Sequence, residues 1–481
     1  MQVLCVSLGL FLVYRAVIRS LGPGQLGVWA LVTSWVAISG ALSLGVPAGV
    51  VRFTAKYLAI GDKRSAEAIL STALLFTMVS SSLMVLLAYP LGLHFIPVFF
   101  DVVSQERDAL RIFPMSLLVF WVSSVASTVL SALDGAHRIK QRTIVWIIST
   151  VIFAMLSLLL VQRWQLMGLM YAQVIQYISL FAVGYLFLRP ALRINISTCS
   201  VSAFRELLAY GSILQIANLC AMAYDPVTKS LIAWFGGAAA TGYYEMAQRV
   251  IIQLRSVVVS SCQALLPTFA SRSFSDAAKQ EAGFYETVAN ITTFFSVPAF
   301  TLLVLSLPIV SILWIGSYQP AFVLYGILLA VGWTTNAISA PAYFASLGTG
   351  LVRQVAAAHL IMALLNIILG GVGGMLGGPV GVAMGWSMSL TVGSVIHIWA
   401  YRRWTMHDGP TFSKISNLRL IVAGLFGYST AIGLLAKPGS LSITVSAVAI
   451  ALAGLGWTAW IHPSRVAIWC WATRRDAAAS V

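Results

Sequence analysis

Long apolar segments separated by short connectors occupy almost the whole of this 481-residue chain. A transmembrane α-helix needs about 20 consecutive, mainly apolar residues to cross the hydrocarbon core of a bilayer. We predict fourteen such helices, at about 2–18, 26–48, 67–90, 109–133, 143–162, 166–188, 204–234, 240–269, 284–307, 321–347, 354–376, 379–400, 418–436 and 441–461. The sequence therefore predicts an all-α, polytopic membrane protein.

The polar part of the chain is too small for a separate soluble domain. Hydrophobic residues make up 59% of the chain and charged residues only 9%. The longest polar stretches, near 52–67 and 402–419, are far shorter than the roughly 100 residues that a soluble catalytic domain needs. The composition therefore argues against an attached soluble enzyme.

Basic residues in the connectors predict the orientation of the chain. Counted by connector, 20 Lys and Arg residues follow even-numbered helices, the last helix included, whereas 5 follow odd-numbered helices. Basic connectors are retained in the cytoplasm, so both termini are expected there. An even number of helices agrees with this, because it places both termini on the same side of the membrane. This retention also accounts for the net charge of +15. We therefore expect a multi-pass protein of the cytoplasmic membrane and no nucleic-acid partner.

Two segments resemble diverged copies of one pattern. Leu21-Gly22 and Leu26-Gly27-Val28-Trp29 precede one apolar helix, and Phe235-Gly236 and Thr241-Gly242-Tyr243-Tyr244 precede another. This correspondence predicts an N-terminal six-helix lobe at 1–190, a C-terminal six-helix lobe at 191–403, and two additional helices with a short tail at 404–481. Transporters built from such repeats bind their substrates between them.

Six charged residues lie at least three residues from either end of a predicted helix and provide the main indication of function. A charge at the centre of a membrane helix costs at least about 2.5 kcal/mol on insertion scales, so it is expected to face a cavity or a partner. The six are Arg15, Asp225, Lys229, Glu245, Arg249 and Arg255.

The predicted helix 240–269 carries a polar face. At 100° per residue, six of its polar side chains fall within an arc of about 120°; they are Glu245, Gln248, Arg249, Arg255, Ser256 and Gln263. This face is typical of the wall of a water-filled cavity. An ion pair between Glu245 and Arg249 that only locks helices together is the alternative. We favour the cavity, because Arg255 has no partner on its own helix.

The predicted helix 204–234 repeats this pattern with Asn218, Asp225 and Lys229. Asp225 and Lys229 are spaced to form an ion pair, and a role in binding substrate or a coupling ion is equally open. For Arg15 and Arg52 we favour a structural role near the membrane surface, although both would attract an anion.

The sequence gives no indication of a metal or cofactor site. The six histidines lack metal-binding spacing, and the five cysteines lie mostly in apolar runs. A glycine-rich run at 370–385 lacks the Lys-Ser/Thr pair of a phosphate-binding loop, so close helix packing around a turn is the better interpretation.

Several short segments together resemble Wzx-type polysaccharide flippases of the multidrug/oligosaccharidyl-lipid/polysaccharide (MOP) exporter superfamily. The similarity covers most of the chain. The segments that carry it are Arg19–Trp29, Leu44-Gly45-Val46-Pro47 with Arg52-Phe53 and Gly61-Asp62, Tyr210-Gly211, Gly242–Arg249, and Asn366 with Gly377–Ala383.

The resemblance implies two six-helix bundles forming a V, with alternating access between them. It also implies a substrate oligosaccharide carried on a polyprenyl diphosphate and moved from the inner to the outer leaflet. Cationic and amide groups would then bind the diphosphate and glycan, and the helical positions select Arg255, Arg249, Lys229, Arg15, Arg52, Gln248, Gln263 and Asn218. Asp225 and Glu245 become candidates for binding a coupling ion. A polysaccharide polymerase or another assembly protein is a candidate partner, besides membrane lipids.

Two other functions remain as alternatives. A drug exporter of the same superfamily would more naturally have an acidic cavity, whereas four of the six in-helix charges are basic. A membrane enzyme of polyprenyl-linked glycan assembly would need an acid–base cluster, and the longest outward connector, 91–108, offers only scattered acidic residues and one histidine.

Overall fold

The computed structural model describes residues 2–38, 46–100, 102–195, 198–266, 268–269, 278–404, 415–436 and 441–465. These residues are almost entirely helical, and each of the fourteen predicted helices overlaps a helix of the structure. Among the described residues, seven helices are long and apolar enough to cross a membrane. The prediction of an all-α, polytopic membrane protein is confirmed.

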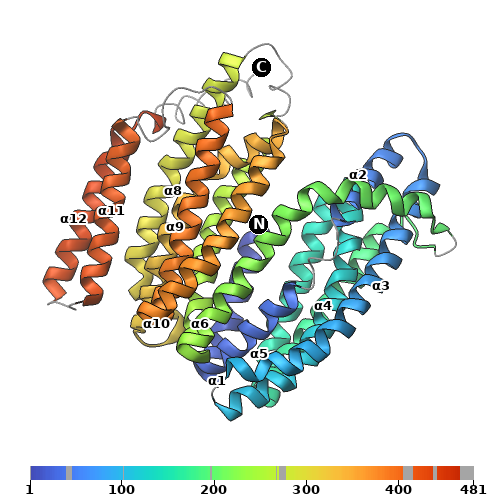
Figure 1. Cartoon of the computed structure of the whole chain (residues 1–481), viewed down its shortest axis with the longest axis horizontal. Helices are drawn as coiled ribbons and strands as arrows, with labels where there is room; N and C mark the ends of the chain where they lie inside the picture. Colours follow the sequence, from blue (N-terminus) through green and yellow to red (C-terminus); the bar gives the residue numbers. More distant parts are fainter. Residues whose placement is uncertain are drawn as a thin grey trace. The chain divides into compact units, whose positions relative to one another are not determined.

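The helices follow one another along the chain with short connections (Figure 1). Their bounds are α1 (Gln2–Ile38), α2 (Val46–Ala59), α3 (Lys63–Phe95), the short 3₁₀ helix η2 (Ile96–Phe99), α4 (Val103–Gly135), α5 (Ile139–Leu188), α6 (Val201–Gln263), α8 (Ala278–Ile315), α9 (Pro320–Gly348), α10 (Val352–Trp404), α11 (Ile415–Ala436) and α12 (Leu441–Trp460).

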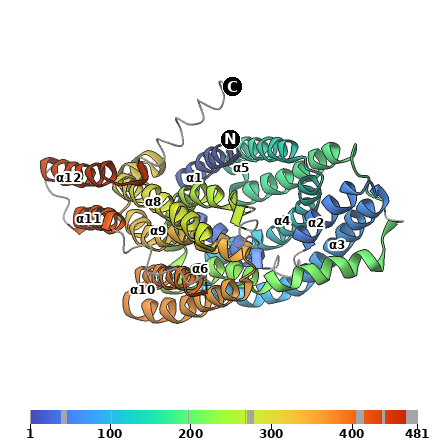
Figure 2. The same cartoon turned by 90° about the horizontal axis from the view of Figure 1, so that it is seen from above.

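The chain forms two compact units, an N-terminal unit, Met1–Tyr243, and a C-terminal unit, Tyr244–Val481. The boundary between them lies inside α6. In the N-terminal unit, α1 packs on α4 and α5, and α2 packs on α3 and α4. In the C-terminal unit, α9 packs on α8 and α10, while α11 packs on α8, α9 and α12 (Figure 2). The V-shaped arrangement of two six-helix bundles stays a prediction, and so do the lobe boundaries after residues 190 and 403 that the sequence suggested.

The end of the second predicted helix, at residue 48, is wrong. Helix α2 begins at Val46 and extends to Ala59, and it therefore contains Arg52 and Lys56, which lie in the predicted connector 49–66. The helix continues because it is amphipathic: its buried face includes Val50 and Phe53, while Arg52 and Lys56 are exposed. Helix length in this segment follows the buried stripe rather than the total hydrophobicity.

Non-helical residues inside four long helices explain why the structure has fewer separate helices than predicted. The breaks lie at Gly22 in α1, Gln165 in α5, Gly237 in α6 and Gly377-Gly378 in α10. In α10, a Cβ atom on Gly381 would collide with the backbone of Gly373, so the two halves fold back on each other as a hairpin. The predicted breaks at the three glycine turns are confirmed.

The breaks occur in two matched pairs. Gly22 (φ 82°, ψ 174°) and Gly237 (φ 74°, ψ −177°) share one backbone conformation. Gln165 (φ 50°, ψ −132°) and Gly378 (φ 59°, ψ −149°) share another. The spacing in sequence is nearly the same in both pairs. This match supports the interpretation that the chain contains an internal repeat.

Gly27 and Gly242 bring the two copies of the repeated pattern into direct contact within the N-terminal unit. A Cβ atom on Gly27 would collide with the carbonyl of Ala238, and one on Gly242 would collide with the carbonyl of Pro23. Each glycine therefore approaches the residue four positions before the other glycine. Small residues at such crossings let two helix backbones approach closely inside a membrane.

A chain of hydrogen bonds connects the start of α11 with the residues after α12 and with α8. Asn417 donates from Nδ2 to Oδ1 of Asn290 (2.8 Å), and its own Oδ1 lies 2.9 Å from Nε2 of His462. The backbone N–H of Ser464 donates to Nδ1 of His462 (3.2 Å). These contacts fit a neutral imidazole that carries its proton on Nε2.

We expect the docking of the segment after α12 to weaken at low pH. Burial lowers the pKa of His462, so the undocked segment binds a proton more readily than the docked one. The stabilisation is therefore complete above about pH 6.5, the ordinary pKa of histidine, and is lost as the pH falls below it. Arg465, whose guanidinium lies over Trp460, adds a positive charge nearby.

Hydrogen exchange of residues 455–465, measured between pH 5 and 8 and corrected for the intrinsic rate, tests this expectation. His462→Gln should remove the extra exchange at low pH. An equal pH dependence in the wild type and the variant would assign the effect to another group.

Candidate functional site

Arg255 lies among uncharged polar and aromatic groups in the C-terminal unit. Its Nε–H donates to Oδ1 of Asn336 (2.7 Å), and its guanidinium carbon lies 4.8 Å from the ring centroid of Trp333. Asn336 in turn donates from Nδ2 to Oγ of Ser394 (3.2 Å). Three helices, α6, α9 and α10, therefore position this arginine.

Close packing of α9 against α10 fixes the partners of Arg255. Trp333 and Asn336 are three residues apart on α9 and so share one face of that helix. Trp333 also contacts Trp386 of α10 edge-on, with ring centroids 6.1 Å apart. The N–H of Gly332 donates to Oγ of Ser387 (3.0 Å), and a side chain on Gly332 would collide with Ser387. The face that meets Arg255 is therefore rigidly supported.

The electrostatics of this cluster favour an anion. The bond to Asn336 uses one of the five guanidinium donors. Within the described ranges, no Asp or Glu side chain lies within the 4.0 Å ion-pair distance of Arg255. A cation held among neutral groups at membrane depth is costly unless an anion accompanies it. Arg255 can therefore bind a negatively charged group in a bidentate manner.

The other polar residues of the predicted helix 240–269 lie in different environments. Arg249 donates from Nε to Oε1 of Glu245 (2.6 Å); the Glu245 side chain is 2% exposed and that of Arg249 is 43% exposed. Gln248 is buried, whereas Gln263 is exposed. The structure thus forms the Glu245–Arg249 ion pair that was the alternative to the favoured cavity wall. Their roles in substrate or ion binding stay predictions.

The candidates of the N-terminal unit include a second ion pair. Lys229 donates from Nζ to Oδ2 of Asp225 (2.6 Å), and the Lys229 side chain is 2% exposed whereas that of Asp225 is 36% exposed. Arg15 is half-buried, and Arg52 is exposed with its guanidinium 5.8 Å from the ring centroid of Phe53. The side chain of Asn218 lies outside the described residues.

Sequence reasoning missed most of the surroundings of Arg255. Trp333, for example, is buried beside Arg255 in the middle of α9. His359 and His397 lie on the two halves of α10, with ring centroids 5.4 Å apart. Their nearly equal distances from Gly377-Gly378 were a usable signal, since a hairpin at that turn brings them together.

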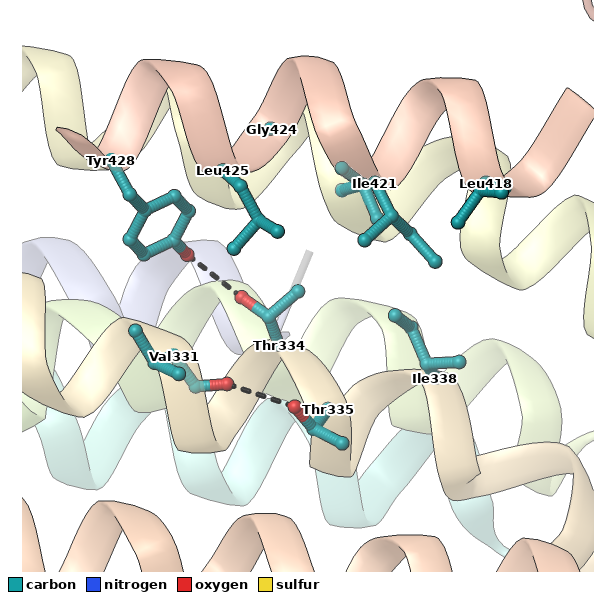
Figure 3. Close-up of a pocket in the computed structure, with 10 residues that line it drawn as sticks. Val331, Thr334, Thr335, Ile338, Leu418, Ile421, Gly424, Leu425 and Tyr428 are labelled. Carbon is teal, nitrogen blue, oxygen red and sulfur yellow. Dashed lines mark hydrogen bonds between the residues drawn. The ribbon is translucent and has the colours of Figure 1, made fainter. Parts of the chain in front are cut away.

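An open apolar groove of about 370 Å³ lies between α9 and α11 in the C-terminal unit. Figure 3 shows Leu418, Ile421 and Leu425 of α11 facing Val331 and Ile338 of α9. The hydroxyls of Thr334 and Tyr428 form a hydrogen bond (2.9 Å) across the groove. Because these two hydroxyls form a hydrogen bond with each other and most of the remaining lining is apolar, the groove is suited to a hydrocarbon chain.

A cavity of about 390 Å³ in the N-terminal unit has a more polar lining. Hydroxyl groups of α3 and α4, together with aromatic side chains of α4 and α5, contribute to its wall; these residues are Thr77, Ser123, Ser124, Ser127, Thr128, Phe120, Trp146 and Tyr177. Many of the hydroxyls donate to carbonyls of their own helix, as Ser124 does to Phe120 (2.9 Å). Their oxygen lone pairs contribute acceptors to the wall.

Comparison with known proteins identifies related sequences and folds. The profile of a family described as polysaccharide biosynthesis protein matches residues 4–273. No curated protein matches the chain at a significant level.

Solved structures of membrane transporters share the fold. A multidrug resistance MATE family transporter of the MOP superfamily, in an inward-facing conformation, has a TM-score of 0.75 at 14% identity, covering 82% of this chain and 93% of its own. The lipid II flippase MurJ, in an inward closed conformation, has a TM-score of 0.66 at 13% identity, covering 93% and 96%. A MOP superfamily transporter from Pyrococcus furiosus, described as having a binding pocket of reversed polarity, has a TM-score of 0.56 at 12% identity, covering 84% and 95%.

Proposed function

This chain belongs to the polysaccharide biosynthesis protein family, as its resemblance to polysaccharide flippases predicted, and we propose that it is a lipid flippase. Its substrate is an oligosaccharide linked to a polyprenyl diphosphate, which it moves from the cytoplasmic to the outer leaflet by alternating access. The membrane is the cytoplasmic membrane, with both termini on the cytoplasmic side, as the 20-to-5 distribution of basic residues favours.

Arg255 is the observation that carries the proposal. It is held by Asn336 and Trp333, which lie on α9, a helix long and apolar enough to cross a membrane, and its described contacts are neutral. A diphosphate brings the negative charge that such a cation requires, and a guanidinium binds phosphate oxygens through two parallel hydrogen bonds. A drug cation would be repelled at the same position. The cationic site therefore favours the lipid-linked substrate over the drug-exporter alternative.

The groove between α9 and α11 supports a lipid-linked substrate as well. Its apolar lining, open to the outside of the unit, fits the polyprenyl chain, which has no hydrogen-bonding groups to satisfy. The two ends of the proposed substrate thus have suitable environments in the C-terminal unit: a cationic one for the diphosphate and an apolar one for the lipid. We further propose a polysaccharide polymerase or another assembly protein as the partner that receives the flipped product.

Transfer between leaflets in proteoliposomes tests the proposal directly. The full chain is reconstituted with a fluorescent polyprenyl-diphosphate oligosaccharide, and a membrane-impermeant quencher reports the fraction in the outer leaflet. We expect the fraction of the fluorescent substrate that the quencher cannot reach, which lies in the inner leaflet, to fall rapidly. Protein-free vesicles, and vesicles that contain a fluorescent neutral glycolipid of equal chain length, are the controls and should lose this fraction slowly. Uptake of a drug cation without flipping of the diphosphate would select the drug exporter instead. Chemical conversion of the lipid-linked glycan would select an enzyme.

Filling the groove should impair transport of long-chain substrates in particular. Thr335→Trp places an indole among the lining residues of α9, and we expect it to slow flipping of a long polyprenyl substrate by roughly tenfold, equivalent to ~1.4 kcal/mol of lost chain packing. A short-chain analogue should be affected much less. The matched control is Ile367→Trp, at an exposed position of α10 that does not line the groove. Equal slowing for both chain lengths would contradict the assignment of the groove.

A further inference from the structure

Two imidazoles, that of the buried His397 and that of the half-buried His359, lie together next to the cationic site. His359 and His397 contact each other edge-on, with ring centroids 5.4 Å apart. The ring of Tyr343 on α9 contacts both, at 5.9 Å from His359 and 5.8 Å from His397. These three rings form one cluster, which we call the imidazole cluster.

Arg255 acts electrostatically on this cluster. Its charge interacts with both Tyr343 and His359. Among the described residues, the titratable side chains that interact with the two imidazoles include Arg255 on α6 and Tyr343 on α9. The positive charge of Arg255 opposes the formation of a second cation beside it. An imidazolium is therefore favoured here only when an anion accompanies it.

His397 carries a nitrogen whose hydrogen-bonding capacity is unused. The residue is 4% exposed, and within the described part of the chain its Nε2 has no hydrogen-bond partner. A buried polar atom without a partner is costly and calls for an explanation. A proton or a phosphate oxygen would supply the missing partner.

The charge of the proposed substrate exceeds what Arg255 offsets. A diphosphate esterified at both ends, to a lipid and to a sugar, has one ionised oxygen on each phosphate. Arg255 neutralises one of these charges, and leaving the second uncompensated at membrane depth is unfavourable. The imidazoles are the groups of this cluster that become cations by gaining a proton.

We infer that His359 and His397 are the proton-binding part of the same anion site, so that the pair takes up one proton from water when the diphosphate binds. The proton adds to an imidazole nitrogen, giving an imidazolium, and returns to water when the diphosphate leaves. Because linkage is reciprocal, protonation strengthens diphosphate binding as much as the diphosphate strengthens protonation. This inference rests on the proposed function and specifies how proton concentration regulates it.

Calorimetry on the full chain in nanodiscs measures the proton uptake. The probe is a short-chain polyprenyl-diphosphate N-acetylglucosamine, whose charge is constant between pH 6 and 8 because each phosphate ionises only once. Binding enthalpies in buffers of different ionisation enthalpy give the number of protons taken up. We expect close to one proton per molecule bound at pH 7.5, and a Kd that decreases by up to tenfold for each pH unit lowered, the limit set by one linked proton.

The double variant His359→Gln/His397→Gln should bind the probe without proton uptake and with a Kd independent of pH. His94→Gln, at an exposed position of α3, is the control and should behave as the wild type does. Binding by the wild type without proton uptake, or unchanged uptake in the double variant, would overturn the inference while leaving the proposed function intact. Failure of the wild type to bind the probe at any pH would instead overturn the proposed function, and this inference with it.

Discussion

Replacement of Arg255 by alanine should reduce flipping of the diphosphate-linked substrate by roughly 10- to 100-fold, because each hydrogen bond to a charged group contributes about 1.5–3 kcal/mol. Abundance in the membrane should remain near that of the wild type, since Arg255 has no acidic partner among the described residues and removing it removes a cost of folding. Flipping assays and quantitative immunoblots, performed on the same vesicles, separate these two effects. Loss of abundance instead of flipping would make Arg255 a structural residue.

Two further variants distinguish the charge of Arg255 from its geometry. Arg255→Lys keeps the charge but loses the planar contact with Trp333 and the fork that binds phosphate, so we expect intermediate flipping. Asn336→Asp places a carboxylate next to the guanidinium, where it competes with the substrate. We expect it to impair flipping as strongly as Arg255→Ala does, while stability stays unchanged or rises. Normal flipping by Asn336→Asp would contradict an anion site at Arg255.

The sequence predicted the helices well because one strong signal specifies each of them. An apolar run of about 20 residues has no alternative to a helix inside a bilayer, since the backbone must satisfy its own hydrogen bonds there. Turns such as Gly377-Gly378 were recognisable from glycine. The break at Gln165 was visible only as a short polar gap between two apolar runs. Glutamine rarely adopts a positive φ, so its presence in the sequence does not indicate a turn as a glycine does. Helix α2 was misjudged because half of its surface is polar.

The site was predictable at its centre but not in its surroundings. Arg255 stands out in any membrane helix, because charge is rare at that depth. Its partner Asn336 lies 81 residues away, and a helical wheel arranges the side chains of one helix only. The wheel therefore grouped Arg255 with Glu245 and Gln263, although the structure gives these residues different environments. His359 and His397 escaped notice because a hairpin, not a short spacing, brings them together.

Gly27→Ala and Gly242→Ala should each strongly reduce the amount of folded protein. A methyl group at either position would overlap a carbonyl oxygen of the opposite helix, at Ala238 or Pro23. A backbone atom cannot rotate away as a side chain can, so the whole crossing must separate. Overpacking of this kind typically costs about 1–3 kcal/mol, and more where backbone is displaced. We expect a lower midpoint of thermal unfolding in detergent and a smaller monodisperse fraction on gel filtration.

Gly454→Ala provides the matched control, because a methyl group at that position of α12 meets no atom within 4 Å. Alanine has the higher helix propensity, so this variant should be at least as stable as the wild type. The two test variants also probe the internal repeat, since Gly27 and Gly242 occupy the same place in the two copies of the pattern. If the repeat places them at one shared crossing, each substitution should be equally damaging, and the double variant should cost less than the sum of the two. Additive losses would show that the two contacts are independent and that their likeness does not reflect a common crossing.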